Sequence, residues 1–243
     1  MTRYALYLGC TVPVRGMNYE MSARKVAGRL DIELVDVDGF SCCGFPAKPL
    51  NCTLTEANHR LKEDAALCAW ANEQLAGMGH TYKGKVRVRH FARMLYEEVG
   101  VEALREAVTA PLEDFGFAQH YGCHYLKPSH LFDGFDDPEN PQSLARLIEA
   151  TGARVVRYED EGQCCGGGIL GFDEETALVV TKQKLDHIAV TEADALVLIC
   201  PFCAIMYEAN QRRVEKLYET SYKLPVLYYP QILGLAMGFS PEE

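Results

Sequence analysis

Residues 117–123, FAQHYGC, decide the fold, because they combine a short strand with a turn at Gly-Cys. Residues 4–10, YALYLGC, show the same pattern early in the chain. In each half a stretch of amphipathic helical period follows, and then a second short strand that leads to Cys-Cys-Gly. Matched features in the same order indicate an internal duplication.

The two halves are expected to contain the same elements. We expect helices at 19–30 and 141–151, strands at 32–37 and 154–158, and a closing strand and helix at 88–95 and 226–233. Alternating strands and helices are typical of a mostly parallel sheet covered by helices. The sequence therefore predicts an α/β protein of two pseudo-symmetric lobes, 1–112 and 113–243, each a mostly parallel sheet flanked by helices.

Composition narrows the classes of partner. The 243 residues carry a formal net charge of −10 and no block of basic residues, which disfavours nucleic acids and anionic membrane surfaces. The sequence shows no signal-peptide layout and no apolar stretch of transmembrane length. We therefore expect a cytoplasmic protein with no direct membrane insertion.

The chain contains ten cysteines. Because disulfides are rare in the cytosol, clustered cysteines there indicate metal or redox chemistry. Cys200 and Cys203 form a Cys-x-x-Cys pair after an expected strand at 195–199, and this spacing can bring two thiolates to one metal centre. The candidate site of the second half consists of Cys123, Cys164, Cys165, Cys200 and Cys203.

Adjacent cysteines such as Cys164 and Cys165 need a turn to converge, because neighbouring side chains of an extended segment point in opposite directions. Glycines 166–168 supply that freedom and give backbone N–H groups room to approach cluster sulfurs. Five thiolates exceed the four ligands of tetrahedral zinc or of a cubane cluster. The excess indicates a cluster with bridging thiolates or a fifth cysteine with another role, and structural zinc is the alternative.

These motifs carry a family resemblance. The order Cys, long gap, Cys-Cys-Gly, second gap and Cys-Pro-x-Cys resembles the cysteine-rich CCG domain. The sequence around these cysteines resembles the B subunit of heterodisulfide reductase and its relatives, and the resemblance covers nearly the whole chain. The segments that carry it are residues 8–13 (LGCTVP), 120–124 (HYGCH), 134–141 (GFDDPENP) and 200–203 (CPFC).

The resemblance implies two CCG domains, each holding a noncubane [4Fe–4S] cluster made of two fused iron–sulfur units. It places a disulfide substrate between the two clusters, each of which takes one sulfur as the S–S bond breaks. The adjacent pairs Cys164, Cys165 and Cys42, Cys43 would then have the catalytic role. Electrons would arrive from the iron–sulfur C subunit of such a complex, fed by its flavin-containing A subunit.

The first half departs from the family pattern. Cys10 precedes Cys42 and Cys43 as the pattern requires, but only Cys52 follows them, with no Cys-x-x-Cys pair. Both halves contain Glu-Ala-Asn, at 56–58 and at 208–210. The interval from Cys43 to the first of these is about thirty residues shorter than the interval from Cys165 to the second. We interpret Cys52 as the last cysteine of the lost pair.

Three interpretations of the first half stay open. A segment of about thirty residues is missing from the chain, or the site is degenerate and holds zinc or a smaller cluster through Cys10, Cys42, Cys43 and Cys52, or the half is a metal-free scaffold. We favour the first, because deleting a buried strand and helix would expose core and leave backbone groups unpaired.

The sequence predicts an iron–sulfur subunit of a heterodisulfide-reductase-like complex that reduces or forms a disulfide or related thiol substrate. The alternative is a non-catalytic electron-transfer or docking subunit with zinc or no metal in its first site. His120 and His124 flank Cys123 and are candidates either for proton donation to a departing thiolate or for hydrogen bonds to cluster sulfur.

Overall fold

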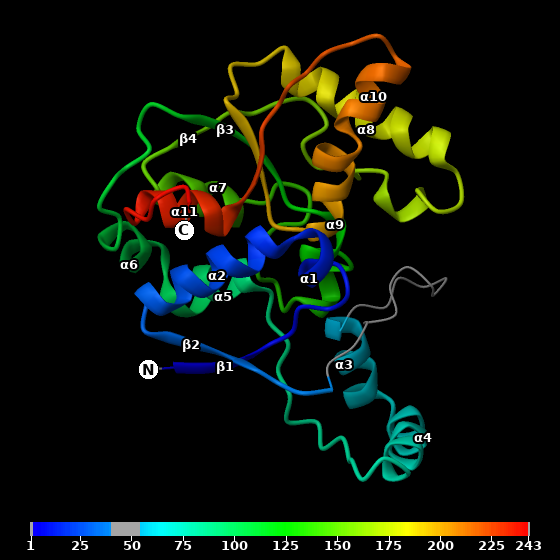
Figure 1. Ribbon diagram of the computed structural model, residues 1–243. Coiled ribbons are helices and arrows are strands. Elements are labelled where there is room, and N and C mark those ends of the chain that lie inside the picture. Colours follow the sequence, from blue (N-terminus) through cyan, green and yellow to red (C-terminus); the bar gives the residue numbers. More distant parts are fainter. Residues whose placement is uncertain (1, 40–53, 243) are drawn as a thin grey trace.

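The computed structural model describes residues 2–39 and 54–242 (Figure 1). The elements of the first half are β1 (Thr2–Leu6), α1 (Val12–Arg15), α2 (Met17–Arg29), β2 (Ile32–Asp36), α3 (Leu54–Glu63), α4 (Ala65–Ala76), α5 (Phe91–Met94), the π-helical turn η1 (Leu95–Val99) and α6 (Val101–Glu106).

The second half begins after a coil that contains the expected lobe boundary at 112/113. Its elements are β3 (Gly116–His120), the short 3₁₀ turns η2 (Cys123–Tyr125) and η3 (Ser129–Leu131), α7 (Ser143–Ala150), β4 (Arg154–Val155), the 3₁₀ turn η4 (Gly167–Ile169), α8 (Glu174–Ala189), β5 (Ala195–Leu198), α9 (Pro201–Ala204), the π-helical turn η5 (Ile205–Ala209), α10 (Gln211–Leu217), β6 (Val226–Tyr228) and α11 (Tyr229–Ala236).

Two parallel sheets form the framework. The first contains β1 and β2, and the second has the order β4-β3-β5-β6. Strands β3 and β5 lie at the centre of the second sheet and every residue in them is buried. Such continuous burial is expected of parallel strands covered on both faces. The predicted α/β class with parallel sheets flanked by helices is confirmed.

In the second half, the sequence accounts for the buried side of α7 and for the residue at which α8 begins. α7 buries Leu144, Leu147 and Ile148, which recur at helical spacing on one side. α8 begins at an N-cap, where the Asp173 carboxylate accepts a hydrogen bond from the backbone N–H of Thr176. These two helices fix the loops that follow β3 and β4.

The two halves share one hydrophobic cluster. It includes Val26 of α2 and Leu95 of η1 together with Phe117 of β3, Leu147 of α7 and Tyr229 of α11, all 3% exposed or less. In Figure 1, α2 runs beside α11, so that helices of both halves lie between the two sheets. The division into lobes 1–112 and 113–243 stays a prediction, because this cluster spans both.

The closing strand expected around residue 88 is wrong for the part of the chain that the structure describes. Residues 85–90 are coil up to the start of α5, whereas their counterparts form β6. β6 pairs with β5, and the first sheet has no described strand in the corresponding place, so an extended segment there has no ladder to join.

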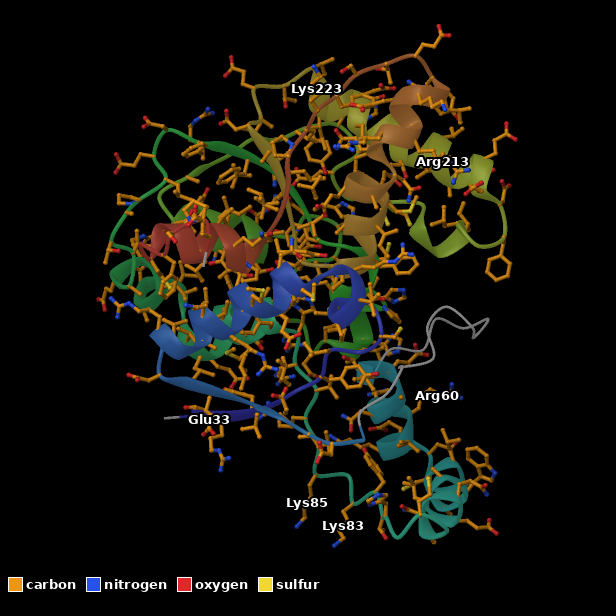
Figure 2. All side chains as sticks on the ribbon, in the orientation of Figure 1. Glu33, Arg60, Lys83, Lys85, Arg213 and Lys223 are labelled. Carbon is orange, nitrogen blue, oxygen red and sulfur yellow. The ribbon has the colours of Figure 1, made fainter. Side chains whose placement is uncertain are left out.

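The hairpin of α3 and α4 projects from the body of the molecule (Figure 1). Neither helix has a buried residue. Figure 2 places Arg60, Lys83 and Lys85 in this same projecting region, away from the second sheet. The contacts of the hairpin include the hydroxyl of Tyr82, in the coil after α4, on Asn58 Oδ1 of α3 at 2.8 Å, and the ring of His59 in α3 edge-on to that of His130 in η3.

Candidate metal centre

The five cysteines of the second half converge at one end of its sheet. Cys123 follows β3 in η2, Cys200 is the N-cap of α9 directly after β5, and Cys203 lies in α9. Cys164 and Cys165 come from the loop between β4 and η4. The carboxyl ends of parallel strands are where open α/β sheets bind ligands. The structure thus brings together the whole set that the sequence singles out.

The five thiols interact in one series that runs Cys123, Cys164, Cys165, Cys203, Cys200. Hydrogen bonds from Cys123 and Cys165 lower the pKa of the Cys164 thiol to about 2, and a hydrogen bond from Cys203 lowers the pKa of Cys200 to about 7. The pKa values of the three donor thiols rise, chiefly because each donor's proton is held by its acceptor. The site stabilises thiolate, the form in which sulfur binds metals.

Gly122 lets the backbone pass close beneath the Cys-x-x-Cys pair. Its φ is +77°, and a Cβ there would lie 2.9 Å from Cys200 Cβ and 3.6 Å from the Sγ atoms of Cys200 and Cys203. Any larger residue would be strained in its backbone and would enter the space between the thiols. The Gly-Cys turn that opens the family motif therefore has a steric reason.

The glycines after Cys165 act as the sequence suggests. The backbone N–H of Gly166 donates to Cys164 Sγ at 3.4 Å, and that of Gly167 donates to Cys165 Sγ at 3.3 Å. Gly166 has φ +84°, and a Cβ on it would lie 2.6 Å from the carbonyl oxygen of Ala177 in α8. The loop is thus pressed against α8 while its N–H groups point at the two adjacent sulfurs.

Two buried polar groups beside the sulfurs have no hydrogen-bond partner in the described part of the chain. They are the ring nitrogens of His120, which is 2% exposed, and the hydroxyl of Tyr207, which is fully buried. Burial lowers the pKa of His120 to about 3, so its ring is neutral and carries one N–H. A ring nitrogen of His120 lies within 4.8 Å of the sulfurs of Cys165 and Cys203.

These features fit an iron–sulfur cluster. Soft thiolates select iron–sulfur clusters or zinc, and buried orphan donors next to them need an acceptor such as a cluster sulfur. Four thiolates and no orphan imidazole would fit closed tetrahedral zinc better than five thiolates do. The ligand roles of the five cysteines stay a prediction.

Side chains of helix α8 hold the Cys-Cys loop through hydrogen bonds to its backbone carbonyl oxygens. The Thr181 hydroxyl donates to the carbonyl oxygen of Cys165 at 2.9 Å. The ammonium of Lys184 donates to the carbonyl oxygens of Asp160 and Glu161 at 2.5 and 3.1 Å. These contacts hold both ends of the segment that delivers the adjacent cysteines.

Most of the first site lies outside the described residues. Cys42, Cys43 and Cys52 fall in the segment 40–53, so the structure does not test their predicted role. Cys10 is exposed and follows Gly9, whose φ of +63° turns the chain after β1. Its place matches that of Cys123 after β3.

The first half reaches the site through His90. Its Nδ1 accepts from the backbone N–H of Ala92 at 3.2 Å, so its Nε2 carries the proton and lies 3.2 Å from the carbonyl oxygen of Ile199. The ring also meets Tyr125 edge-on, with 4.9 Å between centroids. The last residue before Cys200 is therefore held from the other half.

Sequence reasoning missed Lys184 and Thr181. Both lie within the buried stripe of α8, among Leu178, Leu185 and Ile188. A lysine on the apolar face of a helix is the signal that would have found the first of them, because lysine is almost never fully buried without a reason.

Comparison with known proteins agrees with these observations. The cysteine-rich domain family, CCG, matches residues 4–66 and 117–208, so the first match is 29 residues shorter than the second. The chain is 35% identical, over its whole length and 92% of the relative, to the B subunit of ferredoxin:CoB-CoM heterodisulfide reductase from Methanosarcina mazei. That alignment covers 277 residues, so at least 34 of its positions have no counterpart among the chain's 243 residues.

Two further relatives widen the family. A protein of Archaeoglobus profundus, named as similar to the B subunit of heterodisulfide reductase, is 33% identical over the whole chain and 93% of its own length. The "8-methylmenaquinol:fumarate reductase membrane anchor subunit" of Wolinella succinogenes is 27% identical over 99% of the chain and 94% of its own length. In this chain, no helix within the described residues has the length and apolar character to span a bilayer.

The fold also recurs in a solved structure. A hypothetical protein from Helicobacter pylori superposes with a TM-score of 0.72 at 15% identity, over 98% of this chain and half of that one. The family match and the full-length identity confirm the resemblance read from the cysteine motifs. The chain belongs to the family of cysteine-rich CCG proteins that contains the B subunits of heterodisulfide reductases.

Proposed function

We propose that the chain is an iron–sulfur subunit of a heterodisulfide-reductase-like complex, with a noncubane [4Fe–4S] cluster in its second half. The observation that carries this proposal is the convergence of five thiols, two of which, Cys165 and Cys203, lie within 4.8 Å of the unpartnered buried imidazole of His120. Five ligands are one more than a cubane cluster uses, which favours a cluster with bridging thiolates. The names of the relatives support a reductase complex.

The ligands would be Cys123, Cys164, Cys165, Cys200 and Cys203, and the bound cluster would supply single electrons and a place for a substrate sulfur. Reducing a disulfide to two thiols consumes two electrons and two protons. His124, half-buried and adjacent to Cys123, is in the right place to deliver a proton to a departing thiolate. The N–H groups of Gly166 and Gly167 stabilise negative charge on the sulfurs they contact.

The site is graded from solvent to core. Cys123 and Cys164 are exposed, whereas Cys165 and Cys203 are 4% and 2% exposed. A substrate would therefore approach from the side of Cys123 and Cys164, and the buried thiols would hold the cluster away from water. We assign the catalytic role in this half to Cys164 and Cys165.

The partners and substrate follow from the family. Electrons would come from an iron–sulfur protein that resembles the C subunit of such complexes, supplied in turn by a flavin- and iron–sulfur-containing protein that resembles their A subunit. The substrate class would be a small disulfide, for which the CoB–CoM heterodisulfide in the name of one relative is the natural probe. A second cluster at Cys10, Cys42, Cys43 and Cys52 would complete a two-cluster mechanism.

One observation favours a second candidate function. The family match in the first half is 29 residues shorter than in the second. If that half holds zinc or no metal, the chain would pass electrons onward through its one complete site without cleaving a disulfide. Such a protein would be a docking and electron-transfer module.

A redox experiment separates the two. Reduced methyl viologen would be mixed with the anaerobically purified chain and the CoB–CoM heterodisulfide. We expect viologen oxidation that depends on the disulfide and disappears in Cys164→Ser. A cluster that accepts electrons from viologen but gives none to the disulfide would overturn the catalytic proposal in favour of electron transfer.

A further inference from the structure

Lys184 is a fully buried lysine next to the cysteine site. It lies on α8, one turn after Thr181, and only 1% of it is exposed. Taking an ammonium out of water is costly unless other groups compensate it. Lysine is therefore found at such depth only where an anion or a set of acceptors receives it.

The groups that receive Lys184 in the described structure are neutral. Its Nζ donates to the carbonyl oxygens of Asp160 and Glu161, and it lies 5.3 Å from the centroid of the Tyr158 ring. Carbonyl oxygens and a ring face solvate an ammonium partly, but none of them carries a full negative charge.

The nearby carboxylates are bound to other groups. Asp160 Oδ2 accepts from Gln183 at 2.8 Å and lies 3.2 Å from His187 Nδ1. Glu161 Oε1 accepts from the amide of Gln119 and from Arg157 Nη1, the latter at 3.0 Å. No carboxylate of the described residues forms an ion pair with Lys184.

The charge of Lys184 is felt at the cysteine site. Burial lowers the pKa of Lys184 to about 8, while the charges of Asp160, Cys165, Cys203 and Glu161 act to raise it, so the ammonium is largely protonated at neutral pH. In the other direction, after burial, the charge of Lys184 lowers the pKa of His120, whose ring lies beside the same two sulfurs. The ammonium is thus electrostatically coupled to the deep side of the site.

We propose that Lys184 is the buried counter-charge of the cluster in the second half: its ammonium offsets the negative charge of the thiolates and raises the reduction potential of the cluster. The inference rests on the proposed function, since it requires a cluster at the five cysteines. A fixed positive charge in a medium of low dielectric stabilises the reduced, more negative state more than the oxidised one. Lys184 is a positioning residue that also sets potential, and it does not touch substrate.

Three variants separate charge from shape. K184M removes the charge and keeps a long apolar chain, K184Q removes the charge and keeps a donor, and K184R keeps the charge. K182M is the matched control. Lys182 lies on the same helix, but its side chain is partly exposed and forms an ion pair with Asp186.

The measurement is an EPR-monitored redox titration of the anaerobically purified full chain, with iron and sulfide determined on each sample. We expect K184M and K184Q to disfavour reduction by roughly tenfold, a fall in midpoint of about 59 mV for one electron. K184R and K182M should stay near the wild-type midpoint.

Each outcome decides the matter. An unchanged midpoint in K184M with cluster retained overturns the counter-charge. If K184M and K184Q lose the cluster, retention in K184R supports the charge, and loss in K184R as well shows that only the shape of lysine matters and overturns the proposal. A wild-type protein without iron and sulfide would instead overturn the proposed function, so the two failures are distinguishable.

Discussion

The two halves of the molecule begin alike and end differently. β1 pairs in parallel with β2 as β3 pairs with β4, but β5 and β6 extend only the second sheet beyond β3 in the part of the chain that the structure describes. In the second half, the segment between the adjacent cysteines and the Cys-x-x-Cys pair contains α8 and β5. The family match lacks 29 residues in the first half, about the length of that unit.

Matched residues show the physical effect of this difference. Ala118 in β3 is fully buried, whereas its counterpart Ala5 in β1 is exposed. Met206 and Tyr207 of η5 and Val214 of α10 are buried. In contrast, α3, which carries the matching Glu-Ala-Asn, has no buried residue. Within the described residues, the elements of the second half are therefore embedded in a core, whereas their counterparts in the first half lie at the surface.

The largest expected effect comes from the ligands themselves. C165S removes a buried thiol that contacts two others, and we expect it to abolish the cluster of the second half, a greater loss than the roughly 10- to 100-fold in metal affinity that outer-shell changes cause. C10S should leave that cluster intact. Absorbance and EPR spectra of the two variants compare the halves, and equal loss in both would show that the sites are not independent.

The glycine that ties the Cys-Cys loop to α8 should give the next effect. G166A combines a φ of +84° with a Cβ 2.6 Å from the carbonyl oxygen of Ala177, and we expect it to lower the free energy of unfolding by about 3 kcal/mol or more. Gly39 of the first half has the same φ, and no atom of the described residues lies within 4 Å of a Cβ added there, so G39A should lose only about 1 kcal/mol. Urea unfolding of both variants measures the difference, and similar losses would refute the close packing on α8.

The paired alanines test the open edge of the first sheet. A118L overfills the hydrophobic cluster in which Ala118 lies with Ala177, Leu178 and Leu185 of α8, and we expect it to lower the free energy of unfolding by about 1–3 kcal/mol. A5L should change it by less than about 0.5 kcal/mol, because the side chain is exposed. Denaturant titrations check both values. A large loss in A5L would show that the edge of β1 is covered.

The smallest expected effect concerns the link between the halves. Burial lowers the pKa of His90 to about 4, whereas an unfolded histidine titrates near 6.5, so between these values the unfolded chain binds a proton that the folded chain does not. The stability from neutral His90 is complete above pH 6.5 and is lost as the pH falls to about 4. Discounted for partial exposure, the loss is about 1–2 kcal/mol.

A pair of variants isolates that contribution. Unfolding free energies at about pH 7 and about pH 4.5 should differ less in H90Q than in the wild type, because the titrating group is gone. H80Q, at an exposed position, should keep the wild-type difference. An unchanged difference in H90Q would place the acid sensitivity elsewhere.

Much of the fold could be predicted because local pattern and long-range pairing agree. The expected helix at 141–151 corresponds to α7, and the expected strands at 32–37 and 195–199 correspond to β2 and β5. The strand expected near residue 88 failed because a strand forms only beside a partner, and pattern alone does not report a missing partner. The shared core also escaped prediction, since it depends on how α2 meets α11.

The candidate site was predictable where residue identity and spacing alone indicate the chemistry. Cysteine spacing identified the five thiols, and the glycines that follow Cys165 indicated the turn in which N–H groups point at Cys164 and Cys165. The roles of Lys184 and Thr181 were not predictable, because they depend on which face of α8 meets the loop. Side chains that act through packing are visible only once the fold is known.

The central claim is that the five cysteines of the second half hold an iron–sulfur cluster. Iron, zinc and acid-labile sulfide determined on the anaerobically purified chain test it most directly. We predict about four iron and four sulfide per chain for one complete site, with more only if the first site is also filled. Stoichiometric zinc with no sulfide would contradict it.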